Sequence, residues 1–423
     1  MDRNVRNSTL VMTVLVLFVG SSFATDGYFL TGYGAKQQGQ GGAGVALPAD
    51  SLAGATNPAG LVLVGNRYDL GFTLFRPIRS ATIVGNTLPP GYPDANGTYD
   101  ANRVKDFFLP ELGYNHLLNP KLAFGVSIFG NGGLDTSYKT PIPLLGSTRG
   151  GVDIEQLFLS PSVAYKVNSH NSLGVAVNVA YQRFTAEGLQ NFATSSTSSA
   201  PAYVTNTGHA NTYGAGVRIG WLGELNHIVN VGLTYQTKTY TSKFDRYKGL
   251  FAEQGGFDIP ANVAGGIAIK VHPKATVLFD AERIFYGQVK SIANSDANQA
   301  ALGSINGPGF GWHDITAIKT GVSFKVNPAV TLRAGYNYSQ LPFDKTQTFF
   351  NILAPATIQH HLHVGATWSS PSGKEVTLVY VHAFENTVNG VNSIPPTAGG
   401  GNANLRMYQN SVTLGFGWDR NKK

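Results

Sequence analysis

Connections of two very different lengths alternate along this chain, between segments whose pattern is that of β-strands. Some connections are tight turns, as at 119–120 and 327–328, whereas those at 77–104 and 290–311 exceed twenty residues. A membrane barrel sorts its connections in this way, because short turns lie at one rim and long loops at the other. The alternation therefore predicts an all-β fold, a fourteen-stranded antiparallel transmembrane β-barrel.

The N-terminal segment has the pattern of a secretory signal. Arg3 and Arg6 precede an apolar stretch at 10–20, and residues 22–24 form a small-x-small cleavage site. The apolar stretch is shorter than the roughly 20 residues that a membrane-spanning helix needs. We assign 1–24 to a signal peptide, 25–65 to an N-terminal hatch or plug, 66–418 to the barrel and 419–423 to a short polar tail.

Polar and apolar residues alternate with the period of two that defines a β-strand. In 172–182, Val175 and Val177 share one face, and Ala176 and Asn178 share the other. We expect the apolar faces to meet lipid and the small or polar faces to meet the lumen. The predicted strands are 66–76, 105–117, 121–130, 153–167, 171–184, 208–221, 226–240, 257–270, 274–287, 312–326, 330–340, 358–369, 374–386 and 408–418.

The membrane constrains how these strands are arranged. Backbone N–H and C=O groups in hydrocarbon must all be paired, so a spanning sheet has to close on itself. An even number of strands is typical of bacterial single-chain barrels, and it places both ends of the barrel on the rim of short turns. We therefore expect a multi-pass barrel in the bacterial outer membrane, with both termini in the periplasm.

The segment 25–65 is a candidate plug. It is rich in Gly and Ala and shows little strand pattern. Eight-stranded barrels are filled by side chains, whereas barrels of 16 strands or more leave an aqueous channel. A barrel of fourteen strands lies between these cases, and its lumen needs a plug if it is not to leak.

Composition fits a membrane barrel and limits its partners. The chain has 51 Gly, 19 Tyr and 24 Phe, and only 13% of its residues are charged, which is low for a soluble surface. It has no Cys, which excludes disulfides and thiolate metal sites. His361 and His363 share a strand face without a clear third metal ligand. We expect no cofactor and no metal.

The net charge of +7 comes from scattered Lys and Arg rather than from a dense cluster. We therefore expect no nucleic acid partner. The phosphates of outer-membrane lipid and lipopolysaccharide are the better candidates for these cations.

The plug segment contains a Gly/Ala-rich run at 34–46, then Asp50, then Asn57-Pro58-Ala59. Pro58 disfavours a helical conformation at Asn57, and the Asn57 side chain can pair with backbone groups of the plug. This segment resembles the FadL/TodX family of outer-membrane hydrophobic-compound transporters. The family has a glycine-rich hatch, an acidic residue before an Ala-rich turn, and an Asn-Pro-Ala motif leading into the first strand.

The resemblance implies a fourteen-stranded, monomeric transporter rather than an enzyme. It implies passive uptake of long-chain fatty acids or hydrocarbons by extracellular capture, hatch movement and lateral exit through the barrel wall. It also implies that Asn57, Pro58 and Ala59 lie against a kink in an early strand, near 121–130. Family barrels end at an aromatic residue read by the barrel-assembly machinery, and here Trp418 is followed by a polar tail.

Candidate ligand-binding residues come from the plug, the long loops and the lumen. An arginine facing the lumen could hold a carboxylate, and apolar residues could hold the rest of the ligand. The candidates are Tyr28, Phe29 and Leu30 in the plug, Leu250, Phe251, Phe349 and Phe350 in the loops, and Arg333 in the lumen.

Three other functions compete with this reading. A general diffusion porin would have charge-rich strands and a constriction loop, without an N-terminal plug. An outer-membrane hydrolase would need a Ser–His pair or an Asp/His cluster at the rim, and the chain has no Gly-x-Ser-x-Gly motif. An adhesin built on a structural barrel is the remaining alternative.

Overall fold

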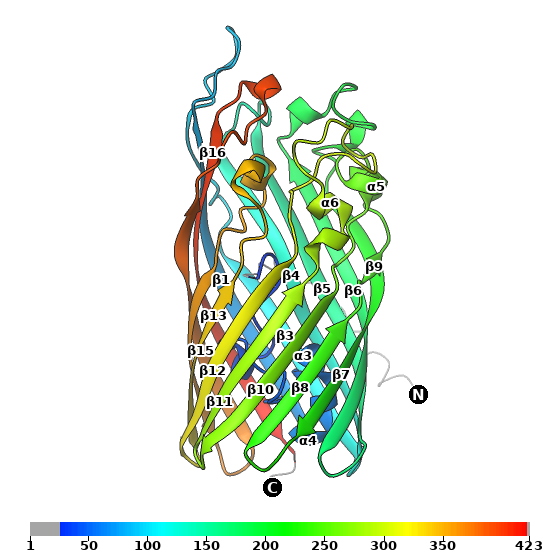
Figure 1. The fold of residues 1–423 in the computed structure, drawn as a ribbon, viewed down its shortest axis with the longest axis vertical. Helices are drawn as coiled ribbons and strands as arrows, with labels where there is room; N and C mark the ends of the chain where they lie inside the picture. Colours follow the sequence, from blue (N-terminus) through cyan, green and yellow to red (C-terminus); the bar gives the residue numbers. More distant parts are fainter. Residues whose placement is uncertain (1–25, 421–423) are drawn as a thin grey trace, which may run out of the picture.

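The computed structural model describes residues 26–420, so the predicted signal peptide and the last three residues lie outside the described part. Within that part, fourteen antiparallel strands form a tall closed wall, and β16 pairs with β1 to complete the ring (Figure 1). The predicted fold class is confirmed. The wall strands are β1 (Arg67–Val84), β3 (Phe107–Asn119), β4 (Leu122–Pro141), β5 (Arg149–Lys166), β6 (Asn171–Glu187), β7 (Ala210–Glu224), β8 (Val229–Gln236), β10 (Asn262–His272), β11 (Ala275–Ile284), β12 (Ile315–Asn327), β13 (Val330–Ser339), β14 (His360–Ser369), β15 (Lys374–Val388) and β16 (Asn402–Asp419).

Short elements lie inside the ring and in the long loops. Two short strands, β2 (Gly97–Asp100) and β9 (Tyr240–Thr241), pair with β1 and β7. No helix in residues 26–420 is long and apolar enough to cross a membrane. The helices are α2 (Ala35–Gln38), α3 (Ala53–Thr56), η1 (Pro58–Gly60), α4 (Leu61–Val64), η2 (Gln190–Phe192), η3 (Pro201–Tyr203), η4 (Asp245–Tyr247), α5 (Ala252–Gly255), η5 (Tyr286–Gln288), α6 (Lys290–Ala293), η6 (Lys345–Gln347), η7 (Phe350–Ile352) and η8 (Pro396–Ala398).

The two faces of each strand carry the predicted residue types. On β6, Val175 and Val177 are 43% and 45% exposed on the outer face, whereas Ala176 and Asn178 are buried toward the lumen. The same outward apolar pattern continues around the ring. A bilayer rather than water can cover such a belt without an energetic cost.

Several strands extend further on the loop side than the sequence predicted. β1 continues to Val84 rather than ending near residue 76, and β4 continues to Pro141 rather than to residue 130. The extensions stand on the loop side of the ring, where outward apolar residues are no longer required, so the alternating pattern fades before the hydrogen bonding ends. Pro77 also suggested a strand end. It is tolerated because β1 has a strand partner on only one side at 76–79.

Residues 26–66 lie inside the ring, as the dark blue segment within the barrel in Figure 1. Most of their side chains are buried, and Leu63 is the exposed exception. The chain leaves the lumen at the turn rim, where the backbone N–H of Arg420 donates to the carbonyl of Asn66 over 2.8 Å. The start of β1 and the end of β16 therefore share the rim of short turns.

Candidate functional site: the filled lumen and a gap in its wall

Asn57 holds the plug segment, residues 26–65, against the wall. Its Nδ2 donates to the carbonyls of Val45 (2.9 Å) and Trp221 (3.0 Å), and its Oδ1 accepts from the N–H of Ala59 (3.1 Å). Its backbone is extended, and Pro58 opens the turn of 3-10 helix that follows. One amide side chain therefore ties two parts of the plug to β7.

The barrel supplies room for this motif through glycines that face inward. A Cβ on Gly174 of β6 would collide with the backbone of Pro58 and Ala59, and one on Gly220 of β7 would collide with Asn57. The motif thus lies on β6 and β7, and the expected contact with a kink near 121–130 is not made by these residues. A different part of the plug makes that contact, as described below.

The acidic residue of the motif, Asp50, stabilises a turn of the plug. Its Oδ1 accepts from the N–H of Leu52 over 3.0 Å. Burial raises the pKa of Asp50 to about 6, and the neighbouring carboxylate of Asp69 adds to the rise, while Lys36 and Arg67 oppose it.

Hydrogen bonds and an ion pair hold the plug to the strands beside the closing seam of the barrel. Asp69 of β1 accepts from the N–H and the hydroxyl of Ser51 (2.9 and 2.5 Å). Glu375 of β15 pairs with Lys36 of the plug (2.5 Å) and with Arg67 of β1 (2.8 Å). These charges are compensated within the lumen, as buried charges must be.

The wall has a gap in its hydrogen bonding between β3 and β4. Their pairing begins at the turn and stops at Leu112 opposite Ile128, although both strands continue toward the loops. β4 also carries a bulge against β5 between Gly130 and Gly132. We name this wall gap, which lies between residues 107–111 of β3 and 129–136 of β4. It falls at the glycine-rich run Gly130-Asn131-Gly132-Gly133.

The first described residues of the plug cover the wall gap from inside. The N–H of Leu30 donates to the carbonyl of Asn131 (3.3 Å), and the N–H of Gly133 donates to the carbonyl of Tyr28 (3.1 Å). Phe29 forms a bridge with Gly132. Backbone groups that β3 leaves unpaired are thus satisfied by residues 28–30.

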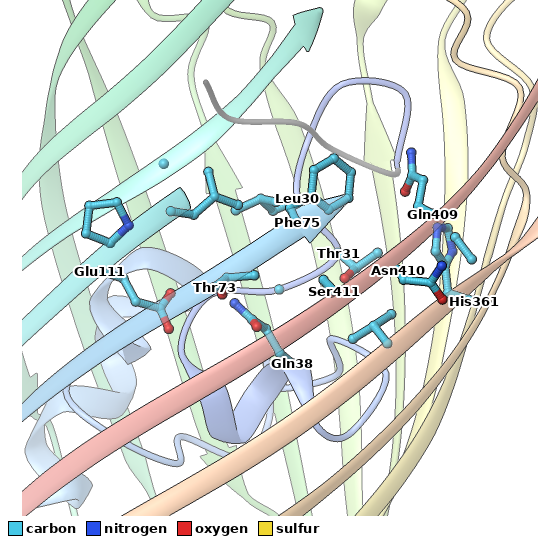
Figure 2. Close-up of a pocket in the computed structure, with 16 residues that line it drawn as sticks. Leu30, Thr31, Gln38, Thr73, Phe75, Glu111, His361, Gln409, Asn410 and Ser411 are labelled. Carbon is cyan, nitrogen blue, oxygen red and sulfur yellow. The ribbon is translucent and has the colours of Figure 1, made fainter. Parts of the chain in front are cut away.

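A cavity lies beside the wall gap, and we name it the inner cavity; about 590 Å³ of space between atoms, including space open to solvent, belongs to it. Figure 2 shows Glu111 at one end, His361 and Gln409 at the other, and Leu30 and Phe75 between them. Its lining mixes apolar and hydrogen-bonding side chains. The lining residues are Leu30, Thr31, Gly32, Gln38, Thr73, Phe75, Leu109, Pro110, Glu111, Gly130, His361, Val381, Ala383, Gln409, Asn410 and Ser411.

A second cavity lies among the long loops, and we name it the loop cavity; about 530 Å³ of space between atoms, including space open to solvent, belongs to it. Its lining is almost wholly apolar. Leu250, Phe251 and Phe350 are part of it, as predicted candidates. Its lining residues are Leu145, Val152, Phe184, Leu189, Phe192, Leu250, Phe251, Ser291, Leu302, Pro308, Gly309, Phe310, Phe350 and Leu353.

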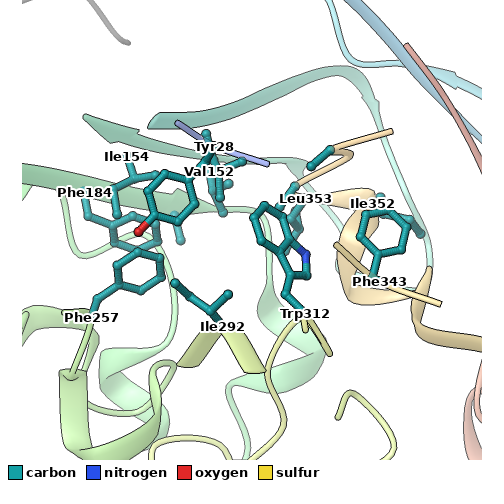
Figure 3. Packing of buried hydrophobic residues seen from close by; sticks show 14 of the residues in the cluster. Tyr28, Val152, Ile154, Phe184, Phe257, Ile292, Trp312, Phe343, Ile352 and Leu353 are labelled. Atoms are coloured by element: carbon teal, nitrogen blue, oxygen red, sulfur yellow. The ribbon is translucent and has the colours of Figure 1, made fainter. Parts of the chain in front are cut away.

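Aromatic side chains connect the loop cavity to the plug. The ring of Phe251 lies 4.9 Å from that of Phe257, which lies 6.4 Å from Tyr28. Tyr28 is also 6.0 Å from Trp312 and 5.2 Å from Phe29, measured between ring centroids. Figure 3 shows Tyr28 among Phe184, Phe257, Ile292 and Trp312.

Two further residues predicted to bind ligand, Phe349 and Arg333, line neither of the two cavities. Phe349 is buried and packs against Phe350, with 5.5 Å between ring centroids. Arg333 of β13 donates to the hydroxyl of Thr367 over 2.6 Å and lines neither the inner cavity nor the loop cavity. The role proposed for Arg333 stays a prediction that neither cavity's lining supports.

Charged groups also hold the start of the plug. Lys319 of β12 lies between Asp26 (3.1 Å) and Glu282 (2.7 Å), and the amide of Asn337 donates to Asp26 over 3.3 Å. Burial raises the pKa of Asp26 to about 6, although the charge of Lys319 acts in the opposite direction. His361 and His363 lie on β14, and residues 26–420 contain no group of three potential metal ligands.

Glu111 and Gln409, which line the inner cavity, and Trp312, which contacts Tyr28, were not among the residues predicted from the sequence. Glu111 carried a usable signal, because a carboxyl group on the lumen side of a spanning strand is costly and usually functional. Gln409 and Trp312 become relevant only through tertiary contacts between distant strands and loops, and no local pattern distinguishes them.

Together, the closed ring, the outward apolar belt and the filled lumen define a membrane-spanning β-barrel with a plugged lumen. The comparisons with known proteins agree. Residues 16–419 match the family of outer membrane transport proteins described as OMPP1/FadL/TodX, and the chain belongs to this family. Family members transport hydrophobic compounds across the outer membrane and are channels rather than enzymes.

Solved structures show the same fold at low sequence identity. The toluene transporter TodX of P. putida is 19% identical, with a TM-score of 0.69 over 92% of this chain and 98% of that one. A FadL homologue of Pseudomonas aeruginosa is 17% identical, with a TM-score of 0.71 over 93% and 100%. The Ralstonia pickettii toluene transporter TbuX is 17% identical, with a TM-score of 0.64 over 92% and 98%. A comparison with curated proteins finds no match.

Proposed function

We propose that this chain carries small hydrophobic molecules passively from the cell exterior into the outer membrane, leaving through the wall gap. Fatty acids, related lipids and aromatic hydrocarbons are the substrate classes considered. The observation that carries the proposal is the unpaired stretch between β3 and β4, beside a cavity lined by Leu109, Pro110 and Gly130. A molecule that exits there enters lipid without crossing the aqueous periplasm.

Capture begins in the loop cavity. Leu250, Phe251 and Phe350 present apolar surface there, and burial of each methylene of a ligand contributes about 0.8 kcal/mol. The aromatic contacts from Phe251 through Phe257 to Tyr28 join the loop cavity to the plug by continuous apolar packing, and a ligand moves along this packing as the side chains shift.

Movement of the plug opens the inner route. Residues 28–30 are the part that moves, because their bonds to Asn131 and Gly133 cover the wall gap. The Asn57 anchor on β7 stays in place while they shift, so the remainder of the lumen stays filled. Asp50, Pro58 and Ala59 belong to this fixed part.

The proposal extends to the orientation of the protein and to its partners. The turn rim, with both ends of the barrel, faces the periplasm, and the long loops face outward. The protein acts as a monomer, meets outer-membrane lipid and lipopolysaccharide with its apolar belt, and reaches the membrane through the barrel-assembly machinery.

Cross-linking the wall gap tests the proposal. Because the chain has no Cys, Leu109→Cys and Gly130→Cys together give one defined pair for a reducible bifunctional maleimide reagent. We expect uptake of radiolabelled toluene or oleate by cells to fall to background after cross-linking and to return after reduction. Val177→Cys with Val217→Cys, paired on β6 and β7, is the control.

Two results would contradict the proposal. Unchanged uptake after complete cross-linking would mean that molecules do not leave through the wall gap. Free passage of small sugars through the uncross-linked protein would indicate a diffusion porin instead.

A further inference from the structure

Three side chains that line the inner cavity have buried polar atoms without a hydrogen-bond partner. These atoms are Oε1 of Glu111, on β3, Oε1 of Gln409, on β16, and both ring nitrogens of His361, on β14. Glu111 and Gln409 are 6% and 2% exposed, and the second oxygen of Glu111 already accepts from the N–H of Gly34 over 3.0 Å. A buried acceptor without a hydrogen bond is unfavourable. A ligand that donates a hydrogen bond to such an acceptor removes this cost, and its binding is strengthened.

The cavity offers no positive charge to a ligand. Among the described residues, no Lys or Arg lines it, and Glu111 and His361 are the titratable side chains of its lining. Nearby cations are already engaged, since Lys319 holds Asp26 and Glu282. A carboxylate in this cavity would be buried without a cation to compensate its charge, and it could donate no hydrogen bond to Gln409.

We propose that the inner cavity selects apolar molecules that carry a hydroxyl group, over plain hydrocarbons and over fatty acid anions. This inference rests on the proposed function and names the substrate class within it. A hydroxyl can donate to Gln409 or to ionised Glu111, and it can accept from Glu111 if that group is protonated. The apolar part of the ligand lies against Leu30, Phe75 and Leu109.

Selection by this cavity is separate from capture. The loop cavity has Ser291 as the polar side chain among its lining residues, and it carries no charged side chain there. It therefore binds hydrocarbon chains whatever their head group, and discrimination takes place at Glu111 and Gln409.

Three probes of equal chain length test the inference: decane, 1-decanol and decanoate at pH 7.5. Binding of radiolabelled probe to the full chain in nanodiscs is measured by equilibrium dialysis against empty nanodiscs. We expect 1-decanol to bind about tenfold more tightly than either other probe, the effect of roughly one hydrogen bond. Gln409→Leu and Glu111→Leu should each lower this preference severalfold, while decane binding stays unchanged.

Controls separate selection from capture and from folding. Gln299→Leu, in an exposed loop, should leave all three affinities unchanged, and Phe350→Ala should weaken all three alike. Heat-dependent migration on a gel establishes that each variant is a folded barrel.

Equal affinity for the three probes, or a preference that survives in both cavity variants, would overturn the inference while leaving hydrophobic transport intact. Absence of binding for every probe in the wild-type protein would refute the proposed function itself, and the inference with it.

Discussion

Replacing Asn57 by alanine measures how firmly the plug is anchored. The change removes donors to the carbonyls of Val45 and Trp221 and the acceptor for the N–H of Ala59. The two carbonyl groups and the N–H group then lose their hydrogen bonds to the side chain of residue 57. At about 1 kcal/mol for each hydrogen bond, the seated plug loses about 3 kcal/mol relative to a locally detached state.

That loss increases the detached population by roughly 100-fold, because each 1.4 kcal/mol changes an equilibrium tenfold. Amide hydrogen exchange reports this population directly when the detached segment reseats faster than chemical exchange occurs. We expect backbone amides of residues 53–60 to exchange up to that factor faster in Asn57→Ala, while amides of β12 and β13 keep their wild-type protection.

The matched control is Asn298→Ala, which removes one hydrogen bond to the carbonyl of Asn306 in an exposed loop. It should leave exchange of the plug unchanged. Wild-type protection of residues 53–60 in Asn57→Ala would refute the argument that this side chain anchors the plug, and equal acceleration in the wall strands would assign the effect to the whole barrel.

Two further predictions concern the residues that cover the wall gap. Asp26 binds its proton more tightly when buried, with a pKa of about 6 against an ordinary 3.8, in the presence of Lys319, Glu282 and Asn337. Seating of residues 28–30 should therefore become more favourable as pH falls from 7 to 5, seen as slower amide exchange after correction for intrinsic rates, and Asp26→Asn should remove this dependence. In Gly132→Val, the new side chain would collide with the carbonyl of Tyr28, so we expect faster tracer uptake and faster exchange at residues 28–30. Gly265→Ala, where a Cβ has room, is its control, and unchanged exchange at residues 28–30 in Gly132→Val would contradict the assignment of these residues as the cover.

The wall was predictable because lipid imposes one rule on every strand. Val175 and Val177 face hydrocarbon, whereas Ala176 and Asn178 face the lumen. This requirement produces an alternation between neighbouring residues that can be recognised from a short stretch of sequence. Above the membrane the rule no longer applies. The upper half of β4, around residues 134–141, therefore lacked the pattern that revealed its lower half.

The interior was predictable only in outline. Gly/Ala richness and Asn57-Pro58-Ala59 identified the plug segment, but the wall glycines that receive it, such as Gly174 and Gly220, lie more than a hundred residues away. Pairing between such distant positions follows from the closed ring and not from neighbouring residues. For the same reason Glu111 and Gln409, on β3 and β16, could not be recognised as parts of one cavity.

The ion pairs beside the seam have a consequence for how the protein is assembled. Ser51 is bonded to Asp69 on the first strand of the wall, and Lys36 to Glu375 on the strand before the last. An unfinished ring, still open between β16 and β1, can offer the segment one of these anchors but not both at their final spacing. The plug can therefore make its final set of contacts only once the ring is closed, so closure of the wall and seating of the plug stabilise one another.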